Sequence, residues 1–240
     1  MNYIERVFEK SRVFLPVIHF KNSEEFFRSV DVAINAGADG LFFIKQGGIS
    51  MIGLDEHIEK VQSKYPEIWK GVNYLCDNAR ALSRLHNQSK LIISGLWCDD
   101  GMIIDNEDIP LEADLFSDKM KEGRKNGKWN GLYFGGVAFK YQKPVKNIDF
   151  VARVAKEYID VVTTSGDGTG KAAKPDKVIT FRKAIGDHAL ALASGVTCTN
   201  VKNYLPYVNA FLVATGIEND FGVLNEEKTN KLSKLIHGYK

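Results

Sequence analysis

Residues 163–177 read TTSGDGTGKAAKPDK, a glycine-rich run with a lysine that is typical of loops handling phosphate groups. The run is not a Walker A loop, because Ser165 stands where that motif needs its first glycine and Ala172 replaces its Ser or Thr. It also lacks the later glycine of the dinucleotide-binding fingerprint. Two interpretations stay open: a loop in which Lys171 faces a phosphate, and a mobile solvated loop whose lysines are surface charges.

Three other polar residues stand where strand-like runs end. Lys140 follows the run GGVAF, and inside a barrel apolar neighbours would lower the pKa of its amine. It can then act as a general base, an electrophile or a Schiff-base former, or it simply extends from the barrel mouth into water. His19 is a candidate acid or base, or a structural hydrogen-bonding group. Asn73 either orients a substrate group or caps its own loop.

Acidic residues supply a further set of candidates. Asp99, Asp100 and Asp105 in WCDDGMIID carry the oxygen ligands that a divalent cation prefers, so such a cation stays open although we expect no resident cofactor. No His or Cys is spaced for a zinc site, and none is predicted. Asp167 would repel a phosphate, so we assign it to sugar hydroxyl groups or a metal, and Asp99 to the orientation of hydroxyl groups.

The elements that must position these residues alternate between apolar strand-like runs and amphipathic helix-like stretches. The helix candidates include residues 23–36, 77–86 and 225–237. Strands apolar on both faces and joined by helices indicate a parallel sheet, and eight such units can close. We therefore predict one (β/α)8 TIM barrel over residues 1–240, with an open doubly wound sheet as the alternative. The predicted strands span residues 13–19, 39–44, 71–74, 91–96, 131–134 with a possible extension, 160–163, 189–193 and 210–214.

In such a barrel the loops after the strands form the functional face. The seventh predicted strand is followed by SGVT and the eighth by ATGI, so small residues and glycines allow backbone amides to approach an anion. The structural alternative is that these glycines only permit tight turns. We predict a phosphate site at this edge, which the glycine-rich loop borders. The residues predicted to bind the phosphate or the rest of the substrate are Asp167, Gly168, Thr169, Gly170, Lys171, Ser194, Gly195, Val196, Thr215 and Gly216.

Composition narrows the class of protein. The chain has 44% hydrophobic and 26% charged residues, as ordinary globular proteins do. Its 32 basic and 30 acidic residues are interspersed, so no nucleic-acid partner is expected. Three cysteines argue against a disulfide framework, and neither a signal peptide nor a membrane-spanning run is found. We therefore expect a cytoplasmic location without membrane insertion, and a homo-oligomer stays open.

Several segments together resemble the BtpA/SgcQ family of the ribulose-phosphate-binding barrel superfamily. They are FLPVIH, AGADGLFFI, GVNYLCDNARALS, GVAFKYQKPV, VVTTSGDGTGKAAKPDK and ASGVTCTNVKNYLPYVNAFLVATGIENDFG, which extend over nearly the whole chain. The resemblance implies a (β/α)8 barrel with a phosphate site at the seventh and eighth loops.

By position, the resemblance also carries over His19, Asn73, Asn78, Lys140 and the GTGK loop of residues 168–171. The chain departs from the family pattern in two places. Lys45 and Gln46 replace an acidic region after the second predicted strand, and Glu218 and Asp220 change the eighth loop. Both departures bear on the identity of the substrate.

The leading hypothesis is an enzyme that acts on a small phosphorylated sugar or nucleotide-like metabolite. Lys140 and His19 would transfer protons or activate a carbonyl, while Asn73, Asp99 and Asp167 would orient hydroxyl groups. Isomerisation, lyase chemistry and ribosyl transfer all fit this set. The alternatives are a non-catalytic binding or assembly factor that keeps the phosphate site, and a purely structural barrel.

Overall fold

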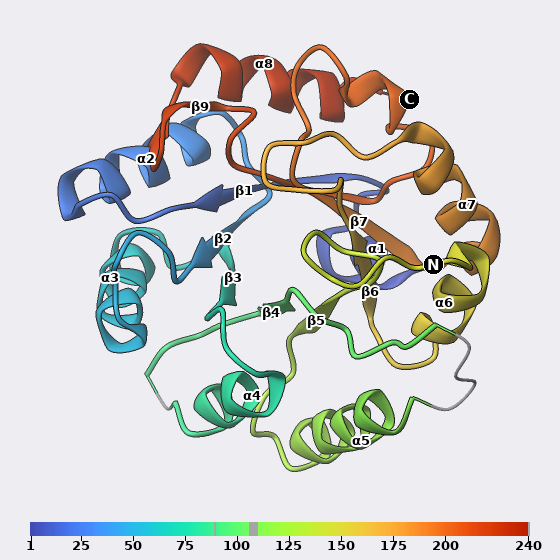
Figure 1. Cartoon of the computed structure of the whole chain (residues 1–240). Coiled ribbons are helices and arrows are strands. Elements are labelled where there is room, and N and C mark those ends of the chain that lie inside the picture. The colour runs from blue at the N-terminus through green and yellow to red at the C-terminus, as the bar shows by residue number, and fades with distance from the viewer. Residues whose placement is uncertain (89, 106–109, 240) are drawn as a thin grey trace.

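Eight parallel strands close into a barrel in their sequence order, with β8 paired to β1 (Figure 1). The computed structural model describes residues 1–88, 90–105 and 110–239. The predicted (β/α)8 TIM barrel is therefore confirmed, and the doubly wound sheet is excluded. The barrel strands are β1 (Val13–Ile18), β2 (Gly40–Ile44), β3 (Trp69–Asn73), β4 (Gly95–Cys98), β5 (Leu132–Gly136), β6 (Val161–Thr164), β7 (Ala189–Ala193) and β8 (Ala210–Val213).

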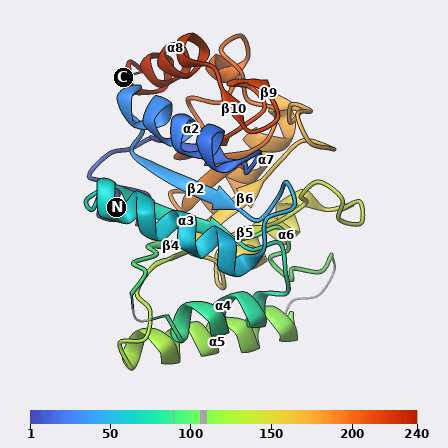
Figure 2. The same cartoon turned by 90° about the vertical axis from the view of Figure 1, so that its left-hand side faces the viewer.

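The helices surround the barrel on its outer side, as the two views show (Figures 1 and 2). Local signals set their ends: Asn22 accepts a hydrogen bond from the amide of Glu25 and caps α2, and Asn225 caps α8 in the same way. The helices are α1 (Tyr3–Phe8), α2 (Ser23–Asn35), α3 (Met51–Lys64), α4 (Asn78–His86), α5 (Leu111–Lys125), α6 (Ile148–Ala155), α7 (Pro175–Ile185) and α8 (Glu226–His237).

The seventh connection differs from the helix expected there. Between β7 and β8 the chain forms only the 3-10 turn η1 (Val201–Asn203) and further turns. Residues 194–209 leave little length for a longer helix, and Pro206 has no backbone amide to continue one.

Large side chains fill the barrel interior where neighbouring strands carry glycine. A Cβ atom on Gly71 would lie 2.3 Å from the ring of Phe42, and one on Gly95 would lie 2.2 Å from the ring of Trp69. These two glycines therefore make room for the rings. Phe42 in turn contacts the ring of Phe134 edge-on, with ring centroids 5.0 Å apart.

Helix α1, which the sequence pattern did not predict, packs against the N-terminal end of the barrel. Its Ile4 is completely inaccessible to solvent and belongs to the cluster of side chains inside the barrel. Asn2 caps the helix through the amides of Ile4 and Glu5. The functional face is thus at the opposite end, where the strands finish.

One strand prediction and the predicted position of Lys140 were wrong in ways that concern this face. The fourth strand lies at Gly95–Cys98 and not at residues 91–96, so Trp97 and Cys98 belong to the barrel wall. Ladder pairing begins only at Ser94, whose amide donates to the carbonyl of Lys70. The fifth strand ends at Gly136, because Ala138 adopts a positive φ of 46° that no strand accommodates. Lys140 therefore lies in a loop and not at a strand end.

The eighth loop contains a short antiparallel hairpin, β9 (Glu218–Asp220) and β10 (Val223–Leu224), that was not predicted. Ser29 of α2 holds the hairpin: its hydroxyl donates to the carbonyl of Gly222 and accepts from the amide of Leu224, both at 3.2 Å. The hairpin therefore lies over the loop that follows β1.

Candidate active site at the barrel mouth

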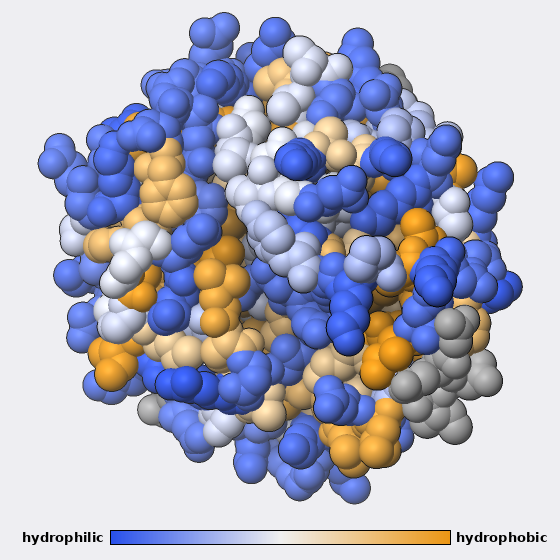
Figure 3. Space-filling model, viewed as in Figure 1, coloured by the Kyte–Doolittle hydropathy of each residue, from blue (hydrophilic) through white to orange (hydrophobic). Residues whose placement is uncertain are grey.

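A cavity of about 230 Å³ opens at the ends of the strands. Hydrophilic residues dominate the rim of this face, and residues of intermediate hydropathy and hydrophobic residues lie among them nearer its centre (Figure 3). Six of the predicted site residues line the cavity together, and they come from the loops after six strands. They are His19, Asp99, Lys140, Thr169, Ser194 and Thr215.

Asp99 is the central carboxylate of the cavity. It accepts a 2.9 Å hydrogen bond from Nδ2 of Asn73, whose Oδ1 accepts from the amide of Leu75. Burial raises the pKa of the Asp99 carboxyl, and the positive charge of Lys140 and the bond from Asn73 offset part of that increase. Asn73 thus supports Asp99 from outside the cavity lining. A carboxyl group that gains a proton more readily than usual beside an amine is suited to proton transfer.

Lys140 is half-buried, and apolar side chains do not enclose it as the sequence suggested. Its amide donates to Oγ of Ser165 at 2.8 Å, which fixes the loop after β5 against the loop after β6. Its ammonium group lies 5.6 Å from the ring centroid of Phe139. Within the described residues the ammonium makes no hydrogen bond to protein, so it is free to meet a ligand in the cavity.

His19 is buried directly after β1 and is held by the loop that follows the neighbouring strand β8. Its Nδ1 lies 2.8 Å from Oε1 of Glu218 in β9. Phe221 stacks on the imidazole ring with centroids 4.8 Å apart. The sequence showed Glu218 only as a departure from the family pattern and gave no sign of this contact.

The seventh and eighth loops carry four backbone amides that make no hydrogen bond to the part of the protein that the structure describes. They belong to Gly195, Val196, Thr215 and Gly216. Val196 is fully inaccessible to solvent, so its amide is costly to leave unpaired. Oxygen atoms of an anion are natural partners for such groups.

Close approaches between loops bring these amides into one region. A Cβ atom on Gly216 would lie 1.8 Å from the carbonyl oxygen of Val196, so the seventh and eighth loops touch there. One on Gly195 would lie 2.1 Å from the carbonyl oxygen of Lys171. These glycines permit tight loop packing, as the structural alternative held, and the packing itself assembles the group of amides.

The glycine-rich loop after β6 is more ordered by hydrogen bonds than the sequence suggested. The amide of Gly170 donates to Oγ of Ser194 at 2.9 Å, and Ser194 in turn donates to the carbonyl of Gly168. The amides of Thr169 and Lys171 are also engaged, by the hydroxyl of Tyr141 and the carbonyl of Gly168. These three amides therefore hold the loop together.

The charged side chains of the same loop are on the surface. Asp167 and Lys171 are both exposed and lie outside the lining of the cavity. Lys177, by contrast, is not the surface charge that the sequence indicated. Its Nζ donates to the carbonyls of Ala138 at 2.5 Å and Ser165 at 2.7 Å, and burial lowers the pKa of its amine. Lys177 thus joins the loops after β5 and β6.

Backbone strain is concentrated on this face. Of the six non-glycine residues with positive φ in the described ranges, all but the helix-terminal Glu9 lie in loops that follow strands. Ser194, with φ of 76°, and the adjacent Gly195 both adopt it directly after β7. Strain of this kind often accompanies binding and catalytic sites. The remaining four residues are Leu75, Met102, Ala138 and Tyr141.

The three aspartates considered for a cation do not come together. Asp105 accepts from the amide of Lys146 at 2.7 Å, and Asp100 accepts from that of Met102 at 2.8 Å. Across residues 1–88, 90–105 and 110–239, no group of three or more His, Cys, Asp or Glu side chains is placed to hold a metal ion. Asn78, carried over from the family, donates to the carbonyl of Asp100 and supports this loop.

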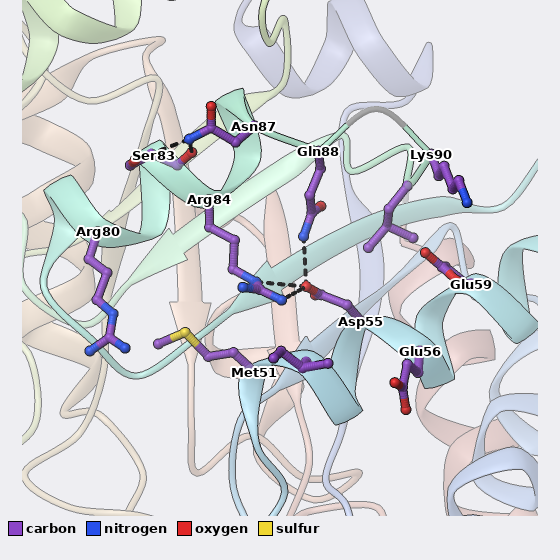
Figure 4. Close-up of a pocket in the computed structure, with 12 residues that line it drawn as sticks. Met51, Asp55, Glu56, Glu59, Arg80, Ser83, Arg84, Asn87, Gln88 and Lys90 are labelled. Carbon is purple, nitrogen blue, oxygen red and sulfur yellow. Dashed lines mark hydrogen bonds and ion pairs between the residues drawn. The ribbon is translucent and has the colours of Figure 1, made fainter.

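A larger cavity of about 580 Å³ lies away from the mouth, between α3 and α4 (Figure 4). Arg84 and Gln88 point toward Asp55 across it, and both donate to this carboxylate at 2.7 Å. Tyr74 donates to the same carboxylate at 2.7 Å from the end of the barrel wall. These hydrogen bonds join α3, α4 and the end of β3 across the cavity, so its polar groups have a structural role. It contains none of the predicted site residues, so the smaller cavity at the strand ends is the candidate site.

Comparison with known proteins supports the fold. No family model matches the chain, and no curated protein matches it by sequence. Among solved structures, (S)-3-O-geranylgeranylglyceryl phosphate synthase from Thermoplasma acidophilum, in complex with its substrate sn-glycerol-1-phosphate, aligns with a TM-score of 0.70 and 13% identity over 100% of both chains. Phosphoribosyl anthranilate isomerase from Thermus thermophilus aligns with a TM-score of 0.64 and 16% identity over 95% of this chain and 100% of that chain.

The same isomerase from Thermotoga maritima aligns with a TM-score of 0.63 and 16% identity, again over 95% of this chain and 100% of that chain. Identities this low establish the barrel fold and leave the reaction to the site itself. The resemblance to the BtpA/SgcQ family stays a prediction. In the described part of the chain, no helix has the length and apolar character needed to cross a membrane.

Proposed function

We propose that this protein is an enzyme of the BtpA/SgcQ type that acts on a small phosphorylated metabolite bound at the barrel mouth. One observation carries the proposal: four backbone amides from the seventh and eighth loops make no hydrogen bond to the described protein, and one of these residues, Thr215, lines a cavity together with ionisable side chains. The phosphate would accept hydrogen bonds from the amides of Gly195, Val196, Thr215 and Gly216. Thr169 and Ser194, which line the same cavity, would contact the ligand beside it.

The reacting part of the ligand would lie between His19, Asp99 and Lys140. Anchoring a phosphate holds the adjacent carbon atoms against these groups, which is how binding energy is converted into rate. An imidazole, a carboxyl with a raised pKa and an ammonium group can move protons to and from carbon or oxygen. Isomerisation, lyase chemistry and ribosyl transfer each need groups of this kind.

The kinds of neighbour found among solved structures agree with this proposal. The synthase from Thermoplasma acidophilum holds sn-glycerol-1-phosphate, and the isomerase from Thermus thermophilus is named for phosphoribosyl anthranilate. We propose the same ligand chemistry here, a phosphate on a short polyhydroxylated carbon chain. Asp167 and Lys171 would reach such a ligand only after the loop after β6 moves inward.

A ligand screen tests this function. We expect sn-glycerol 1-phosphate, ribose 5-phosphate or inorganic phosphate to raise the melting temperature of the protein, and unphosphorylated glycerol and ribose to leave it unchanged. A ligand at 100 times its dissociation constant adds about 2.7 kcal/mol to the free energy of unfolding, an effect that a thermal scan detects easily. If all of the phosphorylated compounds leave the melting temperature unchanged at millimolar concentration, the phosphate site is refuted.

Replacing Lys140 distinguishes an enzyme from a binding protein. Lys140→Met removes the ammonium group and keeps most of the apolar length of the side chain. We expect the variant to bind the phosphorylated ligand while losing the turnover measured for the wild type. Turnover that persists in the variant would exclude Lys140 from the chemistry.

A further inference from the structure

The hairpin of the eighth loop brings a buried carboxylate to His19, the one histidine of the described residues that lines the mouth cavity. The side chains of His19 and Glu218 are 7% and 5% exposed, so water does not compete for their 2.8 Å contact. The two residues are 199 positions apart in the sequence. Their contact is therefore a product of the closed barrel and of the hairpin that folds back over β1.

The hydrogen bonds of Glu218 determine which nitrogen of His19 carries the proton. Oε1 of Glu218 accepts a hydrogen bond from the amide of Gly222 at 3.1 Å as well as lying beside Nδ1 of His19. An ionised carboxylate only accepts hydrogen bonds, so Nδ1 must be the donor in this contact. A neutral imidazole protonated at Nδ1 has its lone pair on Nε2.

The other ring nitrogen is available to a ligand. Nε2 of His19 makes no hydrogen bond to protein within the described ranges, although His19 lines the cavity. Phe221 covers one face of the ring in a nearly parallel stack, with an angle of 15° between the planes. Rotation of the ring is thereby restricted, and Nε2 stays on the cavity side while Nδ1 stays with Glu218.

We infer that Glu218 is a positioning residue that fixes His19 in its Nδ1–H form, so that Nε2 serves as the proton acceptor of the site. This inference rests on the proposed function for the identity of the proton donor, a C–H or O–H group of the phosphorylated ligand. The proton moves to Nε2, and the electron pair of the broken bond stays on the ligand. The resulting imidazolium lies against the carboxylate of Glu218, and the same proton returns to the ligand in the second half of the reaction.

The hairpin also supplies a matched control. Asp220 in the same β9 strand carries an equal charge, but its carboxylate pairs with Lys21 at 2.8 Å and is 70% exposed. Asp220→Asn therefore removes a negative charge from the hairpin and keeps Oδ1, which accepts from the amide of Phe221 at 2.8 Å beside His19. Ser29 holds the hairpin through Gly222 and Leu224, so the hairpin keeps its anchor when Glu218 is replaced.

The tautomer can be measured directly by long-range 1H–15N NMR on the ring nitrogens of the ligand-free protein. His19→Asn identifies the signals of His19 among the five histidines of the chain. In the wild type with His19 in its neutral form, we expect Nδ1 to be protonated and Nε2 to be unprotonated. In Glu218→Ala we expect the signals to move to the Nε2–H form, and in Asp220→Asn to match the wild type.

Three results would overturn the inference: an Nε2–H form in the wild type, an unchanged tautomer in Glu218→Ala, or an equal change in Asp220→Asn. Should Glu218→Ala fail to fold, Glu218→Leu fills the buried space without any hydrogen-bond acceptor and must raise the Nε2–H population. The measurement needs no ligand, so its failure is separate from failure of the proposed function. If sn-glycerol 1-phosphate does not bind while the tautomer is as expected, only the identity of the proton donor is lost.

Discussion

Gly216→Ala tests the arrangement of amides on which the proposed function rests. A Cβ atom at this position would lie 1.8 Å from the carbonyl oxygen of Val196 and 2.9 Å from its carbonyl carbon. Both are backbone atoms, so no side-chain rotation relieves the clash. The seventh and eighth loops must move apart, and the amide of Val196 then separates from those of Thr215 and Gly216.

The expected size follows from general magnitudes. Forcing backbone apart in a packed region costs about 1–3 kcal/mol of stability. An amide at such a site contributes about 0.3–1 kcal/mol to the binding of an anion, so misplacing two of the four weakens binding by about 0.6–2 kcal/mol. That loss corresponds to a dissociation constant for phosphate that is roughly 3- to 30-fold higher.

Calorimetric titration with inorganic phosphate and with sn-glycerol 1-phosphate measures this change, and thermal unfolding measures the loss of stability. Gly186→Ala is the matched control, because Gly186 has a φ of +60° at the end of α7 and no atom within 4 Å of an added Cβ. The control should lose about 1–2 kcal/mol of stability and keep the affinity of the wild type. Phosphate affinity that is unchanged in Gly216→Ala, or equally reduced in Gly186→Ala, would refute the reasoning.

Three further changes probe the neighbouring groups. Asp99→Asn should raise the free energy of unfolding at pH 7, because burial raises the folded-state pKa of the Asp99 carboxyl and so disfavours its charged form. Urea titrations should show this gain becoming smaller as the pH falls toward the ordinary aspartate pKa. The same variant should lose turnover, and a less stable Asp99→Asn at pH 7 would contradict this assignment. Lys177→Met should lower stability by about 1–3 kcal/mol in thermal unfolding, since two carbonyl acceptors lose their donor; an unchanged melting temperature would show that this link is dispensable. Tyr141→Phe should speed hydrogen exchange at the amide of Thr169, which donates to the Tyr141 hydroxyl at 3.3 Å, and equal exchange rates would argue that the bond does not hold the loop.

Much of the barrel could be predicted because its strands are buried on both faces and read as continuous apolar runs. The fourth strand was misplaced because Leu91 and Ile93 are buried outside any strand, whereas Trp97 and Cys98 did not continue the aliphatic pattern. Burial alone therefore does not distinguish a strand from an irregular segment packed under a helix.

The candidate site was predicted where position along a strand was sufficient. His19, Asn73 and Asp99 follow from strand ends, and the structure places them at the mouth. Glu218 was missed because its partner, His19, lies 199 positions away in the sequence. Lys177 was missed because its partners are backbone carbonyls, such as that of Ser165, which the residue types do not reveal. No periodicity in the sequence reports such contacts.

Helix α1 closes one end of the barrel. With Ile4 inserted there and aromatic rings packed along the interior, side chains fill the barrel below the mouth. Under the proposed function, the ligand would therefore enter and leave through the mouth cavity, where the hydroxyls of Tyr141 and Thr169 lie 3.0 Å apart. Release of a product would then have to precede binding of the next substrate.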